Sequence, residues 1–235
     1  MAVLATDDFN RANSSSLGAN WSVQVGSSSA GIGVDSNQVY IDAGATVFVY
    51  YNAVLPPDDQ YCQAKFIETG TNTDRWAVAV RAQSGAASGY YGGRNQSSFG
   101  TYELRIWKRD AAGPTLTSLA VEASSSLAVN DVIKLEVSGT TFNLYVNGVF
   151  RLTATDSQFA SGYAGLSIRQ ASGTNTLPVL DDWEVGDSIA SRTPLVGSLV
   201  VTGIAPVVAS SAAAASKILR PNNIRPRAFA PGIAR

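Results

Sequence analysis

An alternation of apolar and polar side chains with a period of two residues constrains this chain more than any other feature. It is clearest between Asp131 and Asp156, where every second residue of 133–137 and of 142–146 is apolar. Asn147-Gly148 then precedes a third segment of this kind, and this dipeptide strongly favours a two-residue β-turn. Such alternation gives a strand one buried and one wet face. We therefore predict a three-stranded antiparallel meander over this stretch.

The same period recurs along residues 1–187. The clearest further segments are 61–66, 76–81, 102–107 and 163–169, and others lie near 4–9, 21–25, 38–41, 46–51, 116–122 and 180–185. Roughly eleven or twelve short strands with frequent turns and no helical period are typical of β-sandwiches. We predict an all-β fold, a jelly-roll sandwich of two antiparallel sheets followed by an extended C-terminal arm.

The core of this sandwich can be anticipated from its largest side chains. Trp21, Trp76 and Trp183 follow inward patterns or stand at strand ends, so we expect them inside. Cys62 is the single cysteine, which excludes an internal disulfide. It shares its register with Ala64 and Phe66, which predicts a buried structural thiol.

The charge distribution divides the chain in two. All 18 acidic residues and 11 of the 17 basic ones lie in 1–187, whereas 188–235 holds six basic residues and no acid. Five of the nine prolines also lie in this last segment. We predict a folded body over 1–187 and a basic, Pro/Ala-rich docking arm over 188–235. A solvated, disordered terminus is the alternative.

Arginine interleaved with apolar residues in the arm suits a protein groove, where guanidinium groups reach carboxylates and apolar side chains fill pockets. Nucleic acid is disfavoured, because six bases over 48 residues are dilute and only Phe229 could stack on a base. A helix of about two turns is expected over 212–219. The predicted docking residues are Lys217, Ile218, Leu219, Arg220, Ile224, Arg225, Arg227, Phe229 and Arg235.

Several classes of function are excluded by composition. The chain contains no histidine, which removes histidine-based acid–base chemistry, Ser-His-Asp triads and most zinc sites. We find no basic, apolar signal peptide at the start and no apolar stretch of 18 residues. We therefore expect assembly in the host cytoplasm and no membrane partner.

Three parts of the body resemble a known superfamily. Residues 130–148 with 156–166 resemble the concanavalin A-like lectin/laminin-G-like superfamily, 7–13 with 17–21 look like the first strand of its bacterial and phage members, and 181–185 resembles their closing strand. In the arm, 196–208 looks like a short unit of tailed-phage structural proteins. The resemblance implies a jelly roll and a phage setting, but the superfold hosts lectins, glycosidases and inert modules alike.

Glycosidases of this fold carry alternating carboxylates on one strand, which places two acids on one face. This sequence has no such strand. The strands expected on the concave face carry Lys65, Arg81, Arg105 and Arg169 instead, and the adjacent pairs Asp58-Asp59 and Asp181-Asp182 should point to opposite faces. We predict that the protein is not an enzyme.

The acidic residues of the first and last strands suggest a metal site. These strands are often neighbours, which would gather Asp7, Asp8, Asp181 and Asp182, and carboxylate oxygens suit calcium. The alternative, which we favour, is that these acids cap strand ends and that no cofactor is bound.

Carbohydrate binding requires aromatic platforms beside polar groups. Trp107 shares the polar register of its strand with Arg105, and Tyr90, Tyr91 and Arg94 fall in a Gly-rich segment, 88–100, read as a loop. These five residues are the candidate glycan site. Alternatively, a loop covers Trp107 and the tyrosine pair staples a long hairpin.

The function that these observations favour is that of a non-enzymatic virion structural protein of a tailed phage. It would decorate the capsid, or belong to the minor capsid or tail surface, as a multimer anchored to other virion proteins by its arm. A carbohydrate-binding, lectin-like module for adhesion to host-surface glycans is the alternative, and a glycoside hydrolase is the third reading.

Overall fold

The computed structural model describes residues 1–27, 31–42, 44–67, 75–98, 101–111, 113–123, 125, 127–170 and 177–188. The chain divides into two units, Met1–Pro194 and Leu195–Arg235, and every described residue belongs to the first. The predicted docking residues and the helix expected over 212–219 therefore lie outside the described residues. Within the described ranges the structure is all-β, and none of its segments is a helix long and apolar enough to cross a bilayer.

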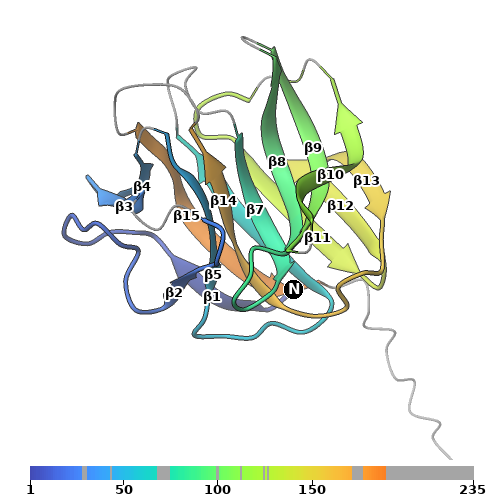
Figure 1. The fold of residues 1–235 in the computed structure, drawn as a ribbon, viewed down its shortest axis with the longest axis horizontal. Helices are drawn as coiled ribbons and strands as arrows, with labels where there is room; N and C mark the ends of the chain where they lie inside the picture. Colours follow the sequence, from blue (N-terminus) through green and yellow to red (C-terminus); the bar gives the residue numbers. More distant parts are fainter. Residues whose placement is uncertain are drawn as a thin grey trace, which may run out of the picture. The chain divides into compact units, whose positions relative to one another are not determined.

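Two antiparallel sheets face each other (Figure 1). The first is an eight-stranded sheet in the order β13-β12-β11-β6-β15-β4-β3, with β1 paired to β15. Its strands are β1 (Val3–Asp7), β3 (Ile32–Asp35), β4 (Gln38–Ile41), β6 (Gln60–Phe66), β11 (Val132–Ser138), β12 (Thr141–Val146), β13 (Val149–Thr155) and β15 (Leu177–Asp187). The adjacency of the first and last strands confirms the expected closure of the sandwich.

The second is a seven-stranded sheet in the order β10-β9-β8-β7-β14-β5-β2. Its strands are β2 (Trp21–Val23), β5 (Thr46–Tyr51), β7 (Arg75–Ala82), β8 (Gly89–Ser98), β9 (Thr101–Asp110), β10 (Gly113–Glu122) and β14 (Tyr163–Arg169). The predicted jelly-roll sandwich is confirmed. Its strands outnumber the expected ones because β3 and β8 were not anticipated.

The meander over 131–156 forms as predicted, as β11, β12 and β13. Its second turn falls on Asn147 and Gly148, both at positive φ (51° and 76°), which is the geometry that a tight hairpin turn demands. The apolar residues of 133–137 are buried and face the other sheet. The period of two therefore identified the three strands and the buried face of 133–137. In β13 the register shifts and Phe150 is 53% exposed.

The core lies between the sheets and is rich in aromatic rings. Trp76 and Trp183 are fully or almost fully buried, and Trp21 is 8% exposed. Trp21 and Trp183 meet edge to face with ring centroids 4.8 Å apart. Cys62 is buried among them, as predicted. Burial of such rings is the main stabilising contribution available to a chain without disulfides.

The Gly-rich segment 88–100 corrects the sequence analysis, because Gly89–Ser98 is a strand and not a loop. Gly92 and Gly93 are there because neither face of β8 has room for a side chain. A Cβ on Gly92 would lie 2.8 Å from Leu144 Cδ1, and one on Gly93 would lie 2.2 Å from the Trp76 carbonyl oxygen. Close approach of neighbouring strands, and not a turn, explains the glycines.

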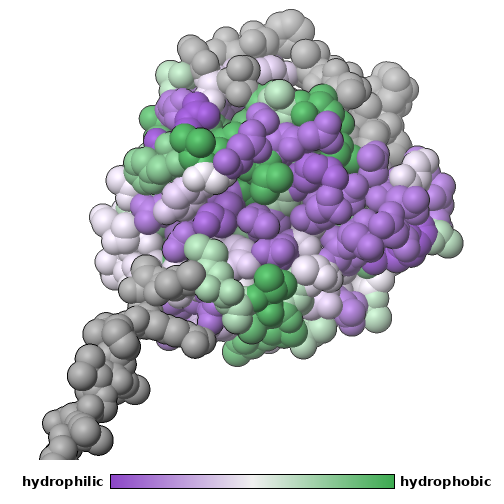
Figure 2. All heavy atoms as spheres, turned by 180° about the vertical axis from the view of Figure 1, so that it is seen from behind, coloured by the Kyte–Doolittle hydropathy of each residue, from purple (hydrophilic) through white to green (hydrophobic). Residues whose placement is uncertain are grey.

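Exposed apolar side chains are scattered over the surface. Val25, Leu55, Val149 and Phe150 are the most exposed of the large ones, between 53% and 75%, apart from those at the N-terminus. The view from behind is mainly hydrophilic, with apolar side chains in separate patches (Figure 2). Single exposed apolar residues of this kind are ordinary on a soluble surface.

Candidate functional site

A depression of about 500 Å³ lies on the outer face of the seven-stranded sheet. Its lining includes Thr46, Phe48, Arg75, Arg109, Leu116 and Arg169. Strand register places Arg169 opposite both Thr46 and Arg75, so these three form one row across β5, β14 and β7. In the next row Ser167 stands opposite Phe48 and Ala77. Ser167 and Ala77 are small and leave the space that larger side chains would fill.

Aromatic rings form a layer beneath the arginines. Phe48 and Tyr91 meet with centroids 5.4 Å apart, and Tyr91 and Trp107 stack at 6.3 Å. All three rings are buried, with at most 2% exposed. The Arg109 guanidinium carbon lies 4.3 Å from the Phe48 centroid, and that of Arg75 lies 5.3 Å from it. The rings therefore hold the guanidinium groups by cation–π contact and do not themselves face solvent.

The depression has a positive electrostatic character. No carboxylate is among its lining residues in the described part of the chain. Burial raises the pKa of the Tyr91 phenol, and the charges of Arg109 and Arg75 act in the opposite direction, which shows that both cations act on the layer beneath them. Such a site can accept planar, oxygen-rich groups through in-plane N–H donors.

The structure divides the five predicted glycan residues between the two faces of the sheet. Trp107 and Tyr91 lie on the outer face, beneath the depression. Arg105 shares that face but forms an ion pair with Glu103. Tyr90 points into the core, where its ring contacts that of Phe142 in a tilted arrangement with centroids 4.2 Å apart.

Arg94 also lies on the inner register of β8. Its guanidinium carbon is 4.7 Å from the Phe66 centroid and 4.3 Å from that of Tyr102. The side chain is 5% exposed. Arg94 therefore packs at the edge of the core and not beside Trp107.

The four basic residues expected together on a concave face also separate. Lys65 belongs to the eight-stranded sheet. Arg81, on β7, is buried and donates hydrogen bonds to the carbonyl oxygens of Asp58 and Gly139, so it holds loops in place. Burial lowers the pKa of its guanidinium, while Asp59, 3.7 Å away, opposes this effect. Of the four, Arg169 alone is among the lining residues.

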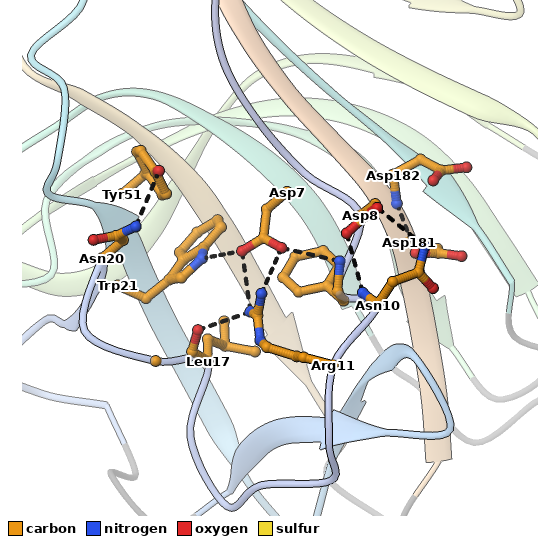
Figure 3. A network of polar contacts seen from close by, with 12 residues as sticks. Asp7, Asp8, Asn10, Arg11, Leu17, Asn20, Trp21, Tyr51, Asp181 and Asp182 are labelled. Atoms are coloured by element: carbon orange, nitrogen blue, oxygen red, sulfur yellow. Dashed lines mark hydrogen bonds and ion pairs between the residues drawn. The ribbon is translucent and has the colours of Figure 1, made fainter.

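Asp7 is the centre of a polar network between the first strand and the following loop (Figure 3). It accepts two hydrogen bonds from Arg11, at 2.8 and 3.0 Å, and one from the Trp21 indole at 2.8 Å. The Phe9 N–H donates to the same carboxylate at 2.9 Å. These partners satisfy Asp7 as a structural anchor, which leaves little room for a cation as well.

The other three acids of the suggested metal site have local partners too. Asp8 accepts hydrogen bonds from the backbone and side chain of Asn10, which lower its pKa. Asp182 forms an ion pair with Lys65. Among the described residues, no three acidic, cysteine or histidine side chains are grouped as a metal would require. The arrangement of the four acids thus resembles strand-end caps more than a calcium cage.

Asp181 and Asp182 do not point cleanly to opposite faces, which corrects another expectation. The register of β15 against β6 shifts between Asp181 and Glu184, and Asp182 has a positive φ of 48°. This bulge lets both carboxylates approach Lys65, at 3.8 Å in the case of Asp181. Burial is the main reason that the pKa of Asp181 is raised. Alternation of side chains holds only where the ladder is regular.

The outer face of the eight-stranded sheet is polar but internally paired. Tyr61 donates to Glu184 at 2.6 Å, and Ser188 donates to Glu136 at the same distance. Lys134 reaches Glu136 at 3.3 Å. These groups therefore satisfy one another.

A second depression, of about 460 Å³, lies beside β3 and β4. Asn13, Asp35, Tyr40 and Asp42 are among its lining residues. Asn13 bonds Asp35 with its side-chain amide and accepts a hydrogen bond from the Ser36 N–H, which fixes the loop. Burial, with the nearby charges of Asp42 and Asp35, raises the pKa of Tyr40. This hollow is acidic where the first is basic.

Comparison with known proteins gives a fold but no family. No family model and no curated protein sequence matches the chain. Three solved structures are similar along most of their length. The carbohydrate-binding module CBM66 of Bacillus subtilis has a TM-score of 0.54 at 15% identity over 72% of this chain and 96% of its own. A Bacillus subtilis protein of unknown function with a galectin-like fold has a TM-score of 0.57 at 12% identity, over 80% of this chain and 96% of its own. The CBM2 module of the evolved Dit of Lactobacillus casei BL23 phage J-1 has a TM-score of 0.54 at 11% identity, over 78% of this chain and 94% of its own.

The same fold serves other roles as well. LamAcat of Zobellia galactanivorans has a TM-score of 0.51 at 10% identity, and the lumenal domain of VIP36, in a Ca²⁺/Man-bound form, has 0.53 at 11%. At these identities the likeness shows a galectin-like, lectin-type jelly roll. Function must be argued from the site itself.

Proposed function

We propose that this protein is a non-catalytic carbohydrate-binding module whose ligand face is the outer face of the seven-stranded sheet. The observation that carries the proposal is the arginine-lined depression on that face. Its volume, about 500 Å³, is in the range of small-molecule sites. The presence of two carbohydrate-binding modules among proteins of the same fold supports this choice over an inert structural role.

The absence of a carboxylate pair supports binding without hydrolysis. Retaining glycosidases hold two carboxyl groups about 5–5.5 Å apart across the scissile bond. No acid lines the depression among the described residues, and Glu103, on the same sheet, is paired with Arg105. A bound saccharide would therefore stay intact.

A glycan array probed with the full-length protein tests the proposal. We expect binding to at least one glycan, weak for a single site and strengthened by dense display. The variant Thr46→Tyr fills the depression without a change of charge and should weaken that binding at least tenfold. Thr153→Tyr, an exposed position on β13 of the other sheet, is the matched control.

The array separates two ways of failing. If the native protein binds no glycan, the proposed function is wrong. If it binds and both tyrosine variants bind equally well, the function stands but the face is wrong. Repeating the array with calcium and with a chelator should give the same result, because the acids of Figure 3 already have partners.

We propose in addition that the module works on a tailed-phage particle, where it contributes to adhesion to host-surface glycans. The structural likeness to a module of a phage Dit supports this setting, as does the basic arm with its Arg220, Arg225 and Arg227. The arm would dock on carboxylates and apolar pockets of other virion proteins. Mass spectrometry of purified particles should then detect the protein, and deletion of residues 217–235 should abolish its incorporation. Full occupancy of the truncated protein would contradict the anchoring role.

A further inference from the structure

The ligand class can be narrowed from the charges at the depression. Three guanidinium groups, from β7, β9 and β14, line one hollow. Seven basic side chains elsewhere among the described residues form ion pairs with acids. These ion-paired residues are Arg11, Lys65, Arg81, Arg105, Lys108, Lys134 and Arg151.

Arg109 differs from this paired set. Among the described residues no ion pair engages its guanidinium, which lies over Phe48. Its Nε is also buried there without a hydrogen-bond partner, a feature that it shares with Arg105. Unpaired buried donors are rare in native proteins, and each points to an acceptor that completes it. A Cβ on Gly26 would lie 3.4 Å from Arg109 Nη2, so the backbone of Gly26 lies directly beside this group.

Phe48 fixes the direction in which Arg109 can bind. The guanidinium carbon lies 4.3 Å from the ring centroid, so the Phe48 ring holds the cation at this position. Arg75 lies over the same ring at 5.3 Å. Both guanidinium groups therefore lie over one ring. Planar N–H pairs match the oxygens of carboxylate, sulfate and phosphate groups.

We infer that the depression takes the anionic group of an acidic saccharide, either a uronic-type carboxylate or a sulfate or phosphate ester. This inference rests on the proposed carbohydrate binding and specifies its ligand class. The Arg109 guanidinium receives the anion in the hollow that Arg75 and Arg169 also line, and the sugar ring lies over the small residues of the sheet.

Matched probes and two variants of the full-length protein test this inference. The probes are oligogalacturonate and its neutral methyl ester, a sulfated galactan oligosaccharide and its unsulfated form, and polyglutamate as a non-saccharide anion. Arg109→Gln is compared with Arg105→Gln as the control. Arg105 is a cation on the same face of the sheet, but it is already paired with Glu103. Binding is measured by calorimetry and on an array of acidic and neutral glycans, at low and at moderate salt.

We expect acidic glycans to bind at least tenfold more tightly than their neutral counterparts. Arg109→Gln should remove at least tenfold of that affinity and Arg105→Gln less than about twofold. Comparison of the oligogalacturonate with the sulfated galactan shows whether a carboxylate or a sulfate is the preferred anionic group. Equal binding of neutral and acidic glycans, or equal losses in the two variants, would overturn the inference while the proposed function stands. Polyglutamate that binds as tightly as any glycan would also overturn it, and no glycan binding at all would remove both proposals.

Discussion

Trp183 donates its indole N–H to the sulfur of Cys62 across 3.0 Å, in the middle of the core. The contact joins β15 to β6, which are neighbours in the eight-stranded sheet. It gives a buried indole N–H a partner without placing a charged or strongly polar group between the sheets. The single cysteine of the chain is therefore part of the packing.

The Cys62 thiol should be unreactive in the folded protein. Burial raises its pKa to about 12, against the smaller lowering effect of the Trp183 hydrogen bond, so the reactive thiolate is scarce at neutral pH. We expect a thiol reagent such as DTNB to label the native protein at pH 8 no faster than it unfolds. One equivalent should react at once in denaturant. Rapid labelling without denaturant would show that the core opens locally.

Asp7→Asn should lower the free energy of unfolding by about 1–3 kcal/mol. It removes the negative charge to which the Arg11 guanidinium, the Trp21 indole and the Phe9 N–H all donate, and it places an amide N–H group opposite these donors. Urea unfolding of the full-length protein measures the change. Asp8→Asn is the control. Asp8 is exposed, and among the described residues its carboxylate accepts hydrogen bonds from Asn10 alone, two residues along the chain, so the unfolding midpoint of this variant should stay close to that of the native protein. Similar losses in the two variants would contradict the central role of Asp7.

The Tyr90 phenol should make stability fall at high pH. Burial first, and then the hydrogen bond to Asp156, raise its pKa from 10.0 to about 12. Because the pKa is higher in the folded state, the stability contributed by the neutral phenol is complete below pH 10 and is lost between about pH 10 and 12. Tyr90→Phe should be less stable than the native protein at pH 8, and the two melting curves should converge as pH rises. Parallel melting temperatures from pH 8 to 12 would refute this.

Gly92→Ala should overpack the core. The added methyl would lie 2.8 Å from Leu144 Cδ1 and 2.9 Å from Leu135 Cδ1, which predicts a loss of about 1–3 kcal/mol in the free energy of unfolding. Leu144→Val removes one of these methyl groups and should restore part of the loss when combined with Gly92→Ala, although it is destabilising alone. Strictly additive effects in this double-mutant cycle would argue against the close packing at Gly92.

The regular parts of the fold could be predicted from the sequence, and the irregular parts could not. Asn147-Gly148 set the register of its hairpin, since turn chemistry and alternation agree there. The loop predicted around Gly92-Gly93 was wrong, because a glycine pair occurs both in loops and in strands whose neighbours leave no room for side chains. The bulge at Asp182 could not be predicted, because the residues around it read like those of a regular strand.

The candidate site was found only in part, for a related reason. Its residues come from strands that are distant in sequence, so no motif joins Phe48, Arg109 and Arg169. Trp107 was noticed because it stood in a polar register. A second signal was present but not used: Ala77, Ala79 and Ser167 are small residues at alternate, outward-facing positions, which is typical of a face that leaves space for a ligand.

The pairing of β1 with β15 has a consequence for how this module can be joined to other polypeptides. The Asp187 N–H donates to the Ala2 carbonyl at 3.0 Å, so the two ends of the sandwich are hydrogen-bonded neighbours. A few added residues could link them, and the chain could be reopened at the Asn147-Gly148 turn as a circular permutant. For the same reason the sandwich could be spliced into a surface loop of a host protein, because its entry and exit points are no farther apart than the two sides of a hairpin.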